Sequence, residues 1–243
     1  MARLKLDVNV DNGFSGRVGF DRARTALESG VELQIEGKTE HIKQGSHICQ
    51  LYNKTSEVVN VAAALIQTGL QNNEKCFYGG QTEVIAEIRA ACQQLDVDVD
   101  GAIERGQLEF IDKREEFFQN KRFDPYFVLS QHQSFIARAV KEGWSACRGA
   151  LDMSWVTEGA ATPSQVLKYE AAADAVFTFQ NSPVVIIVQY NYAKLAGEIV
   201  VELLKLHPLA VVGKYIKRNP YYVDSEEYFM RIVKIDRERR MAG

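Results

Sequence analysis

Apolar and polar positions divide the chain into parts with different patterns. Near the start, the segments 4–10 and 31–35 alternate between apolar and polar residues, which is the period of a half-buried strand. Turns containing glycine separate these segments from the rest of the chain. We therefore expect residues 1–44 to form a partly ordered N-terminal extension with the character of a hairpin.

From residue 45 to about 228, short apolar runs alternate with segments whose apolar residues recur at helical spacing. The predicted strands are His47–Tyr52, Lys75–Tyr78, Gln107–Asp112, Ala146–Met153, Pro183–Tyr190 and Leu209–Lys217. The predicted helices begin near Ser56, Thr82, Asp98, Asp124, Thr162, Lys194 and Asp224. This alternation predicts a three-layer α/β/α domain with a mostly parallel sheet. We expect residues 229–243 to form a charged C-terminal helix or tail.

The turn after the first strand of this domain argues against phosphate chemistry. Nucleotide-binding α/β domains place glycines in this turn, because backbone N–H groups must cradle phosphate. Here no glycine follows Gly45. The segment Gly37-Lys38-Thr39 is no substitute, since the matching upstream position holds Glu32 in place of glycine. We therefore expect a protein that is not an enzyme, with a divergent nucleotide-binding ATPase as the alternative.

Composition and charge narrow the class of partner. The 29 Lys and Arg residues against 32 Asp and Glu give a net charge of −3, which offers no electrostatic case for nucleic acid. The longest apolar run, 184–188, is too short to span a bilayer. Four widely spaced cysteines and the absence of a secretory signal indicate a reduced protein. We expect a cytoplasmic protein that contacts neither membrane nor nucleic acid directly.

Polar and aromatic residues collect where the predicted strands end. Ligands of open α/β sheets bind outside the carboxyl ends of the strands, so these residues are the candidates for a ligand site. They are His47, Cys49, Tyr52, Asp152, Trp155, Glu170, Gln189 and Tyr190. The sequence assigns no catalytic role to any of them and identifies no cofactor.

Several candidates also have a structural interpretation. His47 and Cys49 lie two positions apart on a predicted strand and therefore share a face of the sheet. Three roles are open to them there, namely binding a metal or haem, lining a pocket, or packing in the core. Asp152 ends a strand as a magnesium-binding acid does, but a turn cap or a pair with Arg148 fits it better. Glu170 follows the apolar stripe of its helix, so its carboxylate needs a hydrogen bond, to the backbone or to Arg148.

A series of short segments in a fixed order resembles the MEDS family of sensory domains, first named from methanogens and methylotrophs. The segments are Gly45–Tyr52, Gly69–Cys76, Gly106–Leu108, Arg122–Pro125, Asp152–Trp155, Tyr169-Glu170, Gln189-Tyr190, His207-Pro208 and Asn219–Tyr222. They cover residues 45 to about 228. The resemblance implies a degenerate RecA/KaiC-like fold without a Walker A loop, and a signal-input domain of bacterial and archaeal regulators. It implies no known ligand and no catalytic residues.

Domains of that family are often fused to DNA-binding or histidine-kinase modules, but this sequence shows no helix-turn-helix and no kinase motif. We therefore expect a stand-alone sensory domain that binds a small ligand or a protein partner. Its signal would pass in trans to a transcription factor or kinase, through a regulatory partner or a homo-oligomer. The alternatives are an interaction scaffold without a ligand, and a metal or haem sensor built on His47 and Cys49.

Overall fold

A seven-stranded, mostly parallel sheet forms the centre of the domain. The computed structural model describes residues 31–35, 38–112, 118–119, 122–153, 161–179, 182–212, 215–225, 227–228 and 230–231. The strands of the sheet lie in the order β11 (Tyr215–Arg218), β10 (Leu209–Val212), β3 (Ser46–Tyr52), β9 (Val184–Asn191), β8 (Cys147–Asp152), β4 (Lys75–Gly80) and β5 (Leu108–Asp112). Neighbouring strands are parallel except for β10 and β11, which are antiparallel.

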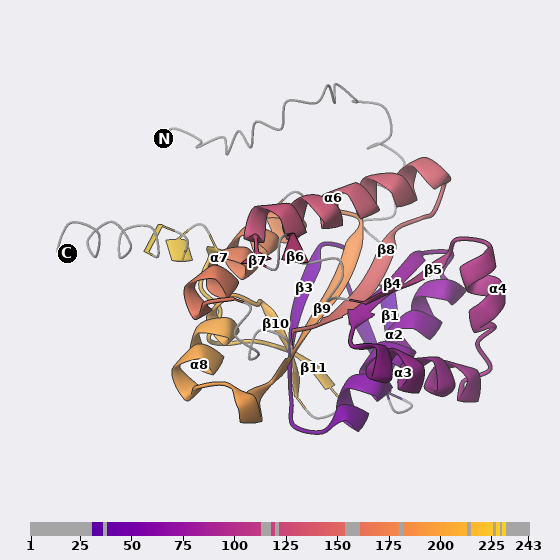
Figure 1. Ribbon diagram of the computed structural model, residues 1–243, viewed down its shortest axis with the longest axis horizontal. Coiled ribbons are helices and arrows are strands. Elements are labelled where there is room, and N and C mark those ends of the chain that lie inside the picture. The colour runs from indigo at the N-terminus through magenta and orange to yellow at the C-terminus, as the bar shows by residue number, and fades with distance from the viewer. Residues whose placement is uncertain are drawn as a thin grey trace.

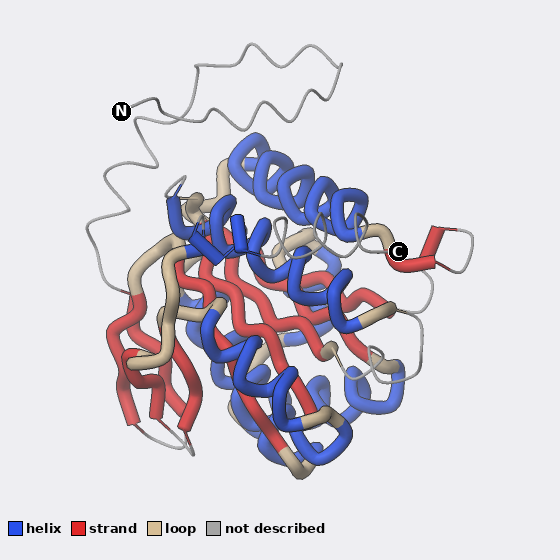
Figure 2. The backbone as a smooth tube through the Cα atoms, turned by 90° about the vertical axis from the view of Figure 1, so that its left-hand side faces the viewer, coloured by secondary structure: helices blue, strands red, loops and turns tan. Residues whose placement is uncertain are grey.

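Helices cover both faces of this sheet (Figures 1 and 2). One face packs against α2 (Thr55–Gln71), α3 (Thr82–Gln94) and α4 (Val99–Glu104). The other packs against α6 (Pro125–Glu142), α7 (Pro163–Asp174) and α8 (Gly197–Lys205). The predicted three-layer α/β/α arrangement and its mostly parallel sheet are confirmed.

Two helix starts predicted from a capping residue followed by proline are also confirmed. The Asp124 side chain accepts the backbone N–H groups of Tyr126 and Phe127, and the Thr162 side chain accepts that of Gln165. These bonds satisfy donors that have no partner within the first helical turn. At its other end α6 stops at Gly143, whose φ of 92° lies in the left-handed region that favours glycine.

The last strand and the helix that follows β9 differ from their predictions. The predicted strand Leu209–Lys217 is two strands, because the chain reverses after Val212 and β11 pairs back on β10. The helix predicted from Lys194 begins at Gly197, after a 3₁₀ turn over Tyr192–Lys194. The helix predicted over 224–239 lies mostly outside the described residues.

Among the described residues, four short strands lie outside the main sheet. In the N-terminal segment, β1 (Val31–Ile35) pairs antiparallel with β2 (Lys38–Ile42), and the pair contacts α2 and β11. A two-residue ladder joins β6 (Phe118–Gln119) and β7 (Arg122–Phe123). No helix among the described residues is long and apolar enough to cross a membrane.

Candidate functional site

The structure separates the predicted site residues onto the two faces of the sheet. The α6–α7 face carries four of them, which are His47, Cys49, Glu170 and Tyr190. The α2 face carries three, which are Tyr52, Asp152 and Gln189. All seven are buried, and Trp155 lies outside the described residues. These seven residues therefore do not meet at one point, and their role in ligand binding stays a prediction.

The histidine–carboxylate cluster, defined as His47, Glu170, Asp174 and His207, lies on the α6–α7 face. Its four side chains have no exposed surface. Nε2 of His47 lies 3.2 Å from Oε2 of Glu170, and Nε2 of His207 lies 3.3 Å from the same oxygen. Nδ1 of His47 faces Oδ1 of Asp174 at 3.4 Å. The two imidazole rings are 4.2 Å apart between centroids. Two histidines and two carboxylates thus share one buried site.

Three separate elements bring these side chains together. His47 is the second residue of β3, and His207 follows the last turn of α8. Glu170 and Asp174 are four positions apart on α7 and so lie on one helix face. In α/β units the carboxyl ends of helices meet the amino ends of the parallel strands. The cluster consequently lies toward the amino edge of the sheet, opposite to the edge that the sequence predicted.

Further hydrogen bonds orient the members of the cluster. The Tyr190 hydroxyl donates to Oε1 of Glu170, and the Tyr222 hydroxyl donates to Oδ2 of Asp174 at 2.9 Å. Nδ1 of His207 lies 2.8 Å from the carbonyl oxygen of Leu203. Since a carbonyl oxygen only accepts, Nδ1 of His207 carries the proton of that bond. Nε2 is the ring nitrogen that faces Glu170.

The carboxylates and the histidines of the cluster shift one another's pKa. Burial by itself lowers the pKa of His47, but the Asp174 and Glu170 carboxylates outweigh burial and raise it. Burial raises the pKa of Glu170, whereas His207 and His47 lower it and prevail. The pKa of Asp174 is lowered in the same way, chiefly by His47. Without another cation, the cluster therefore favours a charged His47 between two carboxylates.

On the α2 face the predicted residues form hydrogen bonds within the protein core. The Tyr52 hydroxyl donates to Oδ1 of Asp152 at 3.0 Å. Nε2 of Gln189 donates to Oε1 of Gln50 at 2.7 Å, and Nε2 of Gln50 donates to the carbonyl oxygen of Glu57 at 3.0 Å. These bonds tie β3, β8 and β9 to one another and to the first turn of α2. Their observed role is structural.

The turn between β3 and α2 is too short for a phosphate loop. Only Asn53 and Lys54 separate the two elements. Oε2 of Glu57 accepts the backbone N–H groups of both residues at 2.9 Å, and these bonds lower the pKa of its carboxyl. Such amides at a helix start are the donors that bind phosphate in nucleotide sites. The predicted absence of a Walker A loop is confirmed, and a carboxylate of the chain occupies the donors.

Arg148 has a partner that the sequence analysis did not assign to it. Its Nε and Nη2 donate to the two carboxylate oxygens of Glu74, at 2.5 and 3.2 Å, and both side chains are buried. Nε2 of Gln44 donates to Oε1 of the same glutamate. The suggested pairs of Arg148 with Asp152 or with Glu170 are therefore wrong.

One group of side chains can hold a metal ion among the residues that the structure describes. The ligand atoms of His47, Glu170 and His207 all lie within 4.8 Å of one another. Cys49, which the sequence suggested as the partner of His47, does not belong to this group. Burial raises the pKa of the Cys49 thiol far above its usual range, which disfavours the thiolate that binds metals. The metal or haem sensor built on His47 and Cys49 is therefore not supported.

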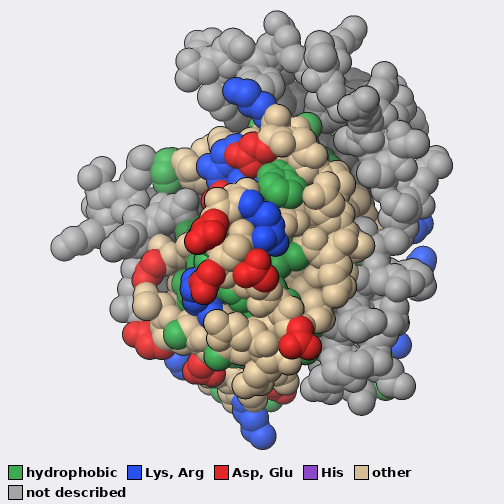
Figure 3. Space-filling model, turned by 90° about the vertical axis from the view of Figure 1, so that its right-hand side faces the viewer, with side chains coloured by type: hydrophobic (Ala, Val, Ile, Leu, Met, Phe, Trp, Pro, Cys, Tyr) green, Lys and Arg blue, Asp and Glu red, His purple; other side chains and the backbone are tan. Residues whose placement is uncertain are grey.

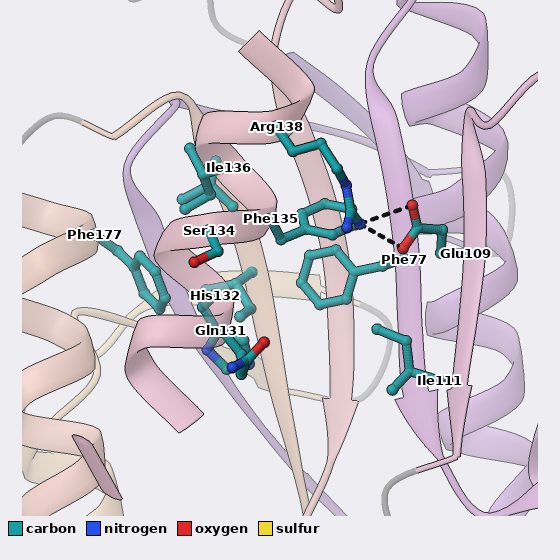
Figure 4. A pocket seen from close by; sticks show the side chains of 12 residues that line it. Phe77, Glu109, Ile111, Gln131, His132, Ser134, Phe135, Ile136, Arg138 and Phe177 are labelled. Carbon is teal, nitrogen blue, oxygen red and sulfur yellow. Dashed lines mark hydrogen bonds and ion pairs between the residues drawn. The ribbon is translucent and has the colours of Figure 1, made fainter. Parts of the chain in front are cut away.

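A small pocket opens between α6 and the sheet (Figure 4). Its volume is about 110 Å³, and most of its walls are aromatic or aliphatic side chains, namely Phe77, Ile111, Phe135, Ile136, Phe177, Val184 and Ile186. The polar side chains at its edge are Glu109, Gln131, His132, Ser134 and Arg138. Arg138 and Glu109 form an ion pair at 2.7 Å beside it. Phe177 also contacts the ring of His47, so the pocket adjoins the histidine–carboxylate cluster.

Besides Asp174, which lies one helical turn after Glu170, three residues of these sites were missed as candidates. His207 and Tyr222 lie in segments that carry the family resemblance, but nothing in the sequence places them beside His47. His132 was read only as part of a helix, and the structure places it at the pocket with its Nδ1 3.3 Å from the Tyr169 hydroxyl. The segments that resemble the family contain His207 and Tyr222, whereas nothing in the sequence indicated a role for His132.

Comparisons with known proteins agree with the resemblance seen in the sequence. Residues 46–208 match the family described as the MEthanogen/methylotroph, DcmR Sensory domain, or MEDS. The chain is 23% identical over 189 residues to the transcriptional repressor DcmR of Methylorubrum extorquens, a match that covers 78% of this chain and 67% of that protein. It is also similar to the crystal structure of the flagellar accessory protein FlaH from Methanocaldococcus jannaschii. That match has a TM-score of 0.49 and 15% identity, and it covers 77% of this chain and 84% of the other.

The family match spans well over half of the chain and includes both the histidine–carboxylate cluster and the walls of the pocket. It agrees with the predicted family, and it gives the protein a sensory, regulatory role. The chain belongs to the MEDS family of sensory domains.

Proposed function

We propose that this domain is a non-enzymatic signal-input module that binds a small, mostly apolar molecule in the pocket between α6 and the sheet. The observation that carries the proposal is the pocket itself. Apolar walls with a few polar groups at one side are typical of small-molecule sites. An engineered apolar cavity of about 150 Å³ binds benzene. A pocket of 110 Å³ suits a ligand of comparable or smaller size.

We also propose that the domain transmits its signal by contact with another protein. The curated relative is named a transcriptional repressor. We infer that this domain passes its ligand state to a regulatory protein, or to a second copy of itself. Figure 3 shows acidic and basic side chains interspersed on the side of the molecule that lies to the right in Figure 1. Arg89 of α3 and Asp100 of α4 form an ion pair, and the described residues drawn in Figure 3 gather no basic patch that would suit nucleic acid.

Benzene and short-chain alcohols are suitable first probes of the pocket. We expect them to raise the melting temperature of the wild-type protein and to shift amide signals of α6 in NMR spectra. Ile111→Phe places extra atoms in the pocket and should abolish both effects. Ile103→Phe makes the same change at an exposed position of α4 outside the pocket and should leave them intact.

The result that contradicts the pocket assignment is a probe effect that survives in Ile111→Phe, or one that no probe produces. A separate measurement covers the natural ligand. Mass spectrometry of small molecules released from the native protein should find a compound of this size. The compound should be depleted in Ile111→Phe preparations and present in Ile103→Phe preparations.

A further inference from the structure

We propose that His47, Glu170 and His207 bind a divalent transition-metal ion of the zinc class. The three residues come from β3, from α7 and from the segment after α8, and all are fully buried. Two imidazole nitrogens and one carboxylate oxygen are a ligand set used by zinc and similar ions. The site is separate from the pocket of the proposed function and does not depend on it.

The spacing of the donor atoms fits a tetrahedral ion. Zinc bonds to nitrogen and oxygen are about 2.0–2.2 Å long, so two ligands of a tetrahedral site lie roughly 3.3–3.6 Å apart. The distances from Oε2 of Glu170 to the two Nε2 atoms are 3.2 and 3.3 Å. Small side-chain movements are enough to admit the ion. Three protein ligands leave its fourth position to water or to a small ligand.

The donor atoms lack hydrogen-bond partners of their own. Nε2 of His47, Nε2 of His207 and Oε2 of Glu170 are buried, and none makes a hydrogen bond to the described residues. Buried polar atoms are normally satisfied, and an exception indicates an ion, a water or a functional group. In addition, the Leu203 carbonyl group holds the Nδ1 proton of His207, so Nε2 is the nitrogen that faces Glu170 and is available to a metal ion. An ion between Nε2 and the carboxylate would bind both.

The surrounding contacts have the arrangement that orients metal ligands. Metal-binding histidines usually donate their other ring nitrogen to a carboxylate or a backbone carbonyl group. Here Nδ1 of His207 faces the Leu203 carbonyl oxygen, and Nδ1 of His47 faces Asp174. The remaining Glu170 oxygen accepts the Tyr190 hydroxyl. Asp174 is therefore a positioning residue that acts through His47.

The backbone next to these residues is irregular. α7 ends at Asp174 and continues directly as a π-helical turn, Ala175–Phe179. Turns of this kind are rare and occur frequently at functional sites. The turn carries Phe177, whose ring packs against His47. An ion in the cluster would join β3, α7 and the end of α8 at one point.

The first experiment measures metal content and cobalt spectra. The full chain is purified without chelators and without a histidine tag, and elemental analysis should find one zinc ion per chain. Cobalt added during refolding should give the visible absorption bands of a tetrahedral site. Because the ligands are buried, refolding in zinc or cobalt tests the site even if the folded protein exchanges the ion slowly.

Variants assign the ion to these residues. Glu170→Gln and His207→Gln keep the approximate size of each side chain and should lose the ion. His132→Gln removes a histidine of α6 that does not belong to the metal-ligand group and should retain the ion. Asp174→Asn should lower the affinity for zinc about 10–100-fold, as changes to such outer contacts do, measured by competition with a chelating dye.

Two results overturn the proposal. One is wild-type protein that takes up no stoichiometric zinc or cobalt after refolding, which makes the cluster a proton-linked ion pair of His47 with its carboxylates. The other is Glu170→Gln protein that binds zinc as tightly as the wild type. If the variants fail to fold, the cobalt spectrum of the wild-type protein decides the matter.

Discussion

Single side chains in this domain are held by buried polar contacts that link distant segments. Glu74 is an example, because it accepts Arg148 and Gln44 and lies between α2 and β4. A buried ion pair adds little net stability compared with apolar residues, yet removing one partner strands a charge in the core. Removing one member of such a pair therefore destabilises the fold more than replacing both members with apolar residues does.

Glu74→Gln should consequently be strongly destabilising. We expect the free energy of unfolding to fall by about 3–5 kcal/mol, because the Arg148 guanidinium loses its counter-charge in the core. Denaturant titration followed by circular dichroism measures the change. Glu227→Gln breaks an exposed pair with Arg231 and should alter stability by less than about 0.5 kcal/mol. Similar losses in the two variants would contradict this account of Glu74.

At the scale of helices and strands, two boundaries that short-range hydrogen bonds set were predicted correctly. The starts of α6 and α7 follow from Asp124 and Thr162, whose bonds span only two or three residues. The β10–β11 hairpin was missed because the apolar pattern of 209–217 does not record where the chain reverses. The start of α2 was assigned to Ser56 as the cap, whereas Glu57 makes the stabilising bonds to Asn53 and Lys54.

The bonds of Glu57 predict a dependence on pH. Since they lower its pKa in the folded protein, they stabilise the fold fully above the unfolded value of 4.5. This stabilisation is lost as the pH falls through the lower folded value. We expect Glu57→Gln to cost roughly 0.5–1 kcal/mol at pH 7. The difference from the wild type should close in titrations below pH 4.5, and a constant difference down to pH 2 would count against it.

The candidate site was predictable only in part, for a similar reason. The period of two along a strand already separates His47 and Cys49 from Tyr52, and Gln189 from Tyr190. This alternation alone places the candidate residues of the strands on two faces of the sheet. Which helix covers each face, and that His207 reaches Glu170, depends on packing between distant segments, which periodicity does not encode.

Across the whole molecule, protection should decrease from the centre of the sheet toward its edges. β3 and β9 have a strand on each side and helices on both faces, and nearly all their residues are buried. β11 is an edge strand with a single neighbour and two exposed residues among its four. Opening of an edge needs fewer contacts to break than opening of the core.

Hydrogen exchange measures this difference directly. We expect backbone amides of Ile186 and Ile187 in β9 to exchange on the order of tenfold or more slowly than those of β11. Peptide-resolved mass spectrometry at neutral pH gives both rates from one sample. Equal rates in the two strands would show that the sheet opens as one unit and that its edge has no lower local stability.

The carboxylate of Glu57 at the start of α2 has a consequence for how such a sensor can work. Because Glu57 occupies the amides of Asn53 and Lys54, we expect no nucleotide to act at this turn and a ligand to act by shifting an equilibrium between two states. Full switching between two states requires roughly 10⁴-fold selective binding, about 5.5 kcal/mol. A ligand small enough for the pocket gains at most about 1.5 kcal/mol per non-hydrogen atom. For a six-atom ligand such as benzene this ceiling is about 9 kcal/mol, so more than half of the affinity would have to distinguish the two states, which favours a graded response to concentration over an abrupt one.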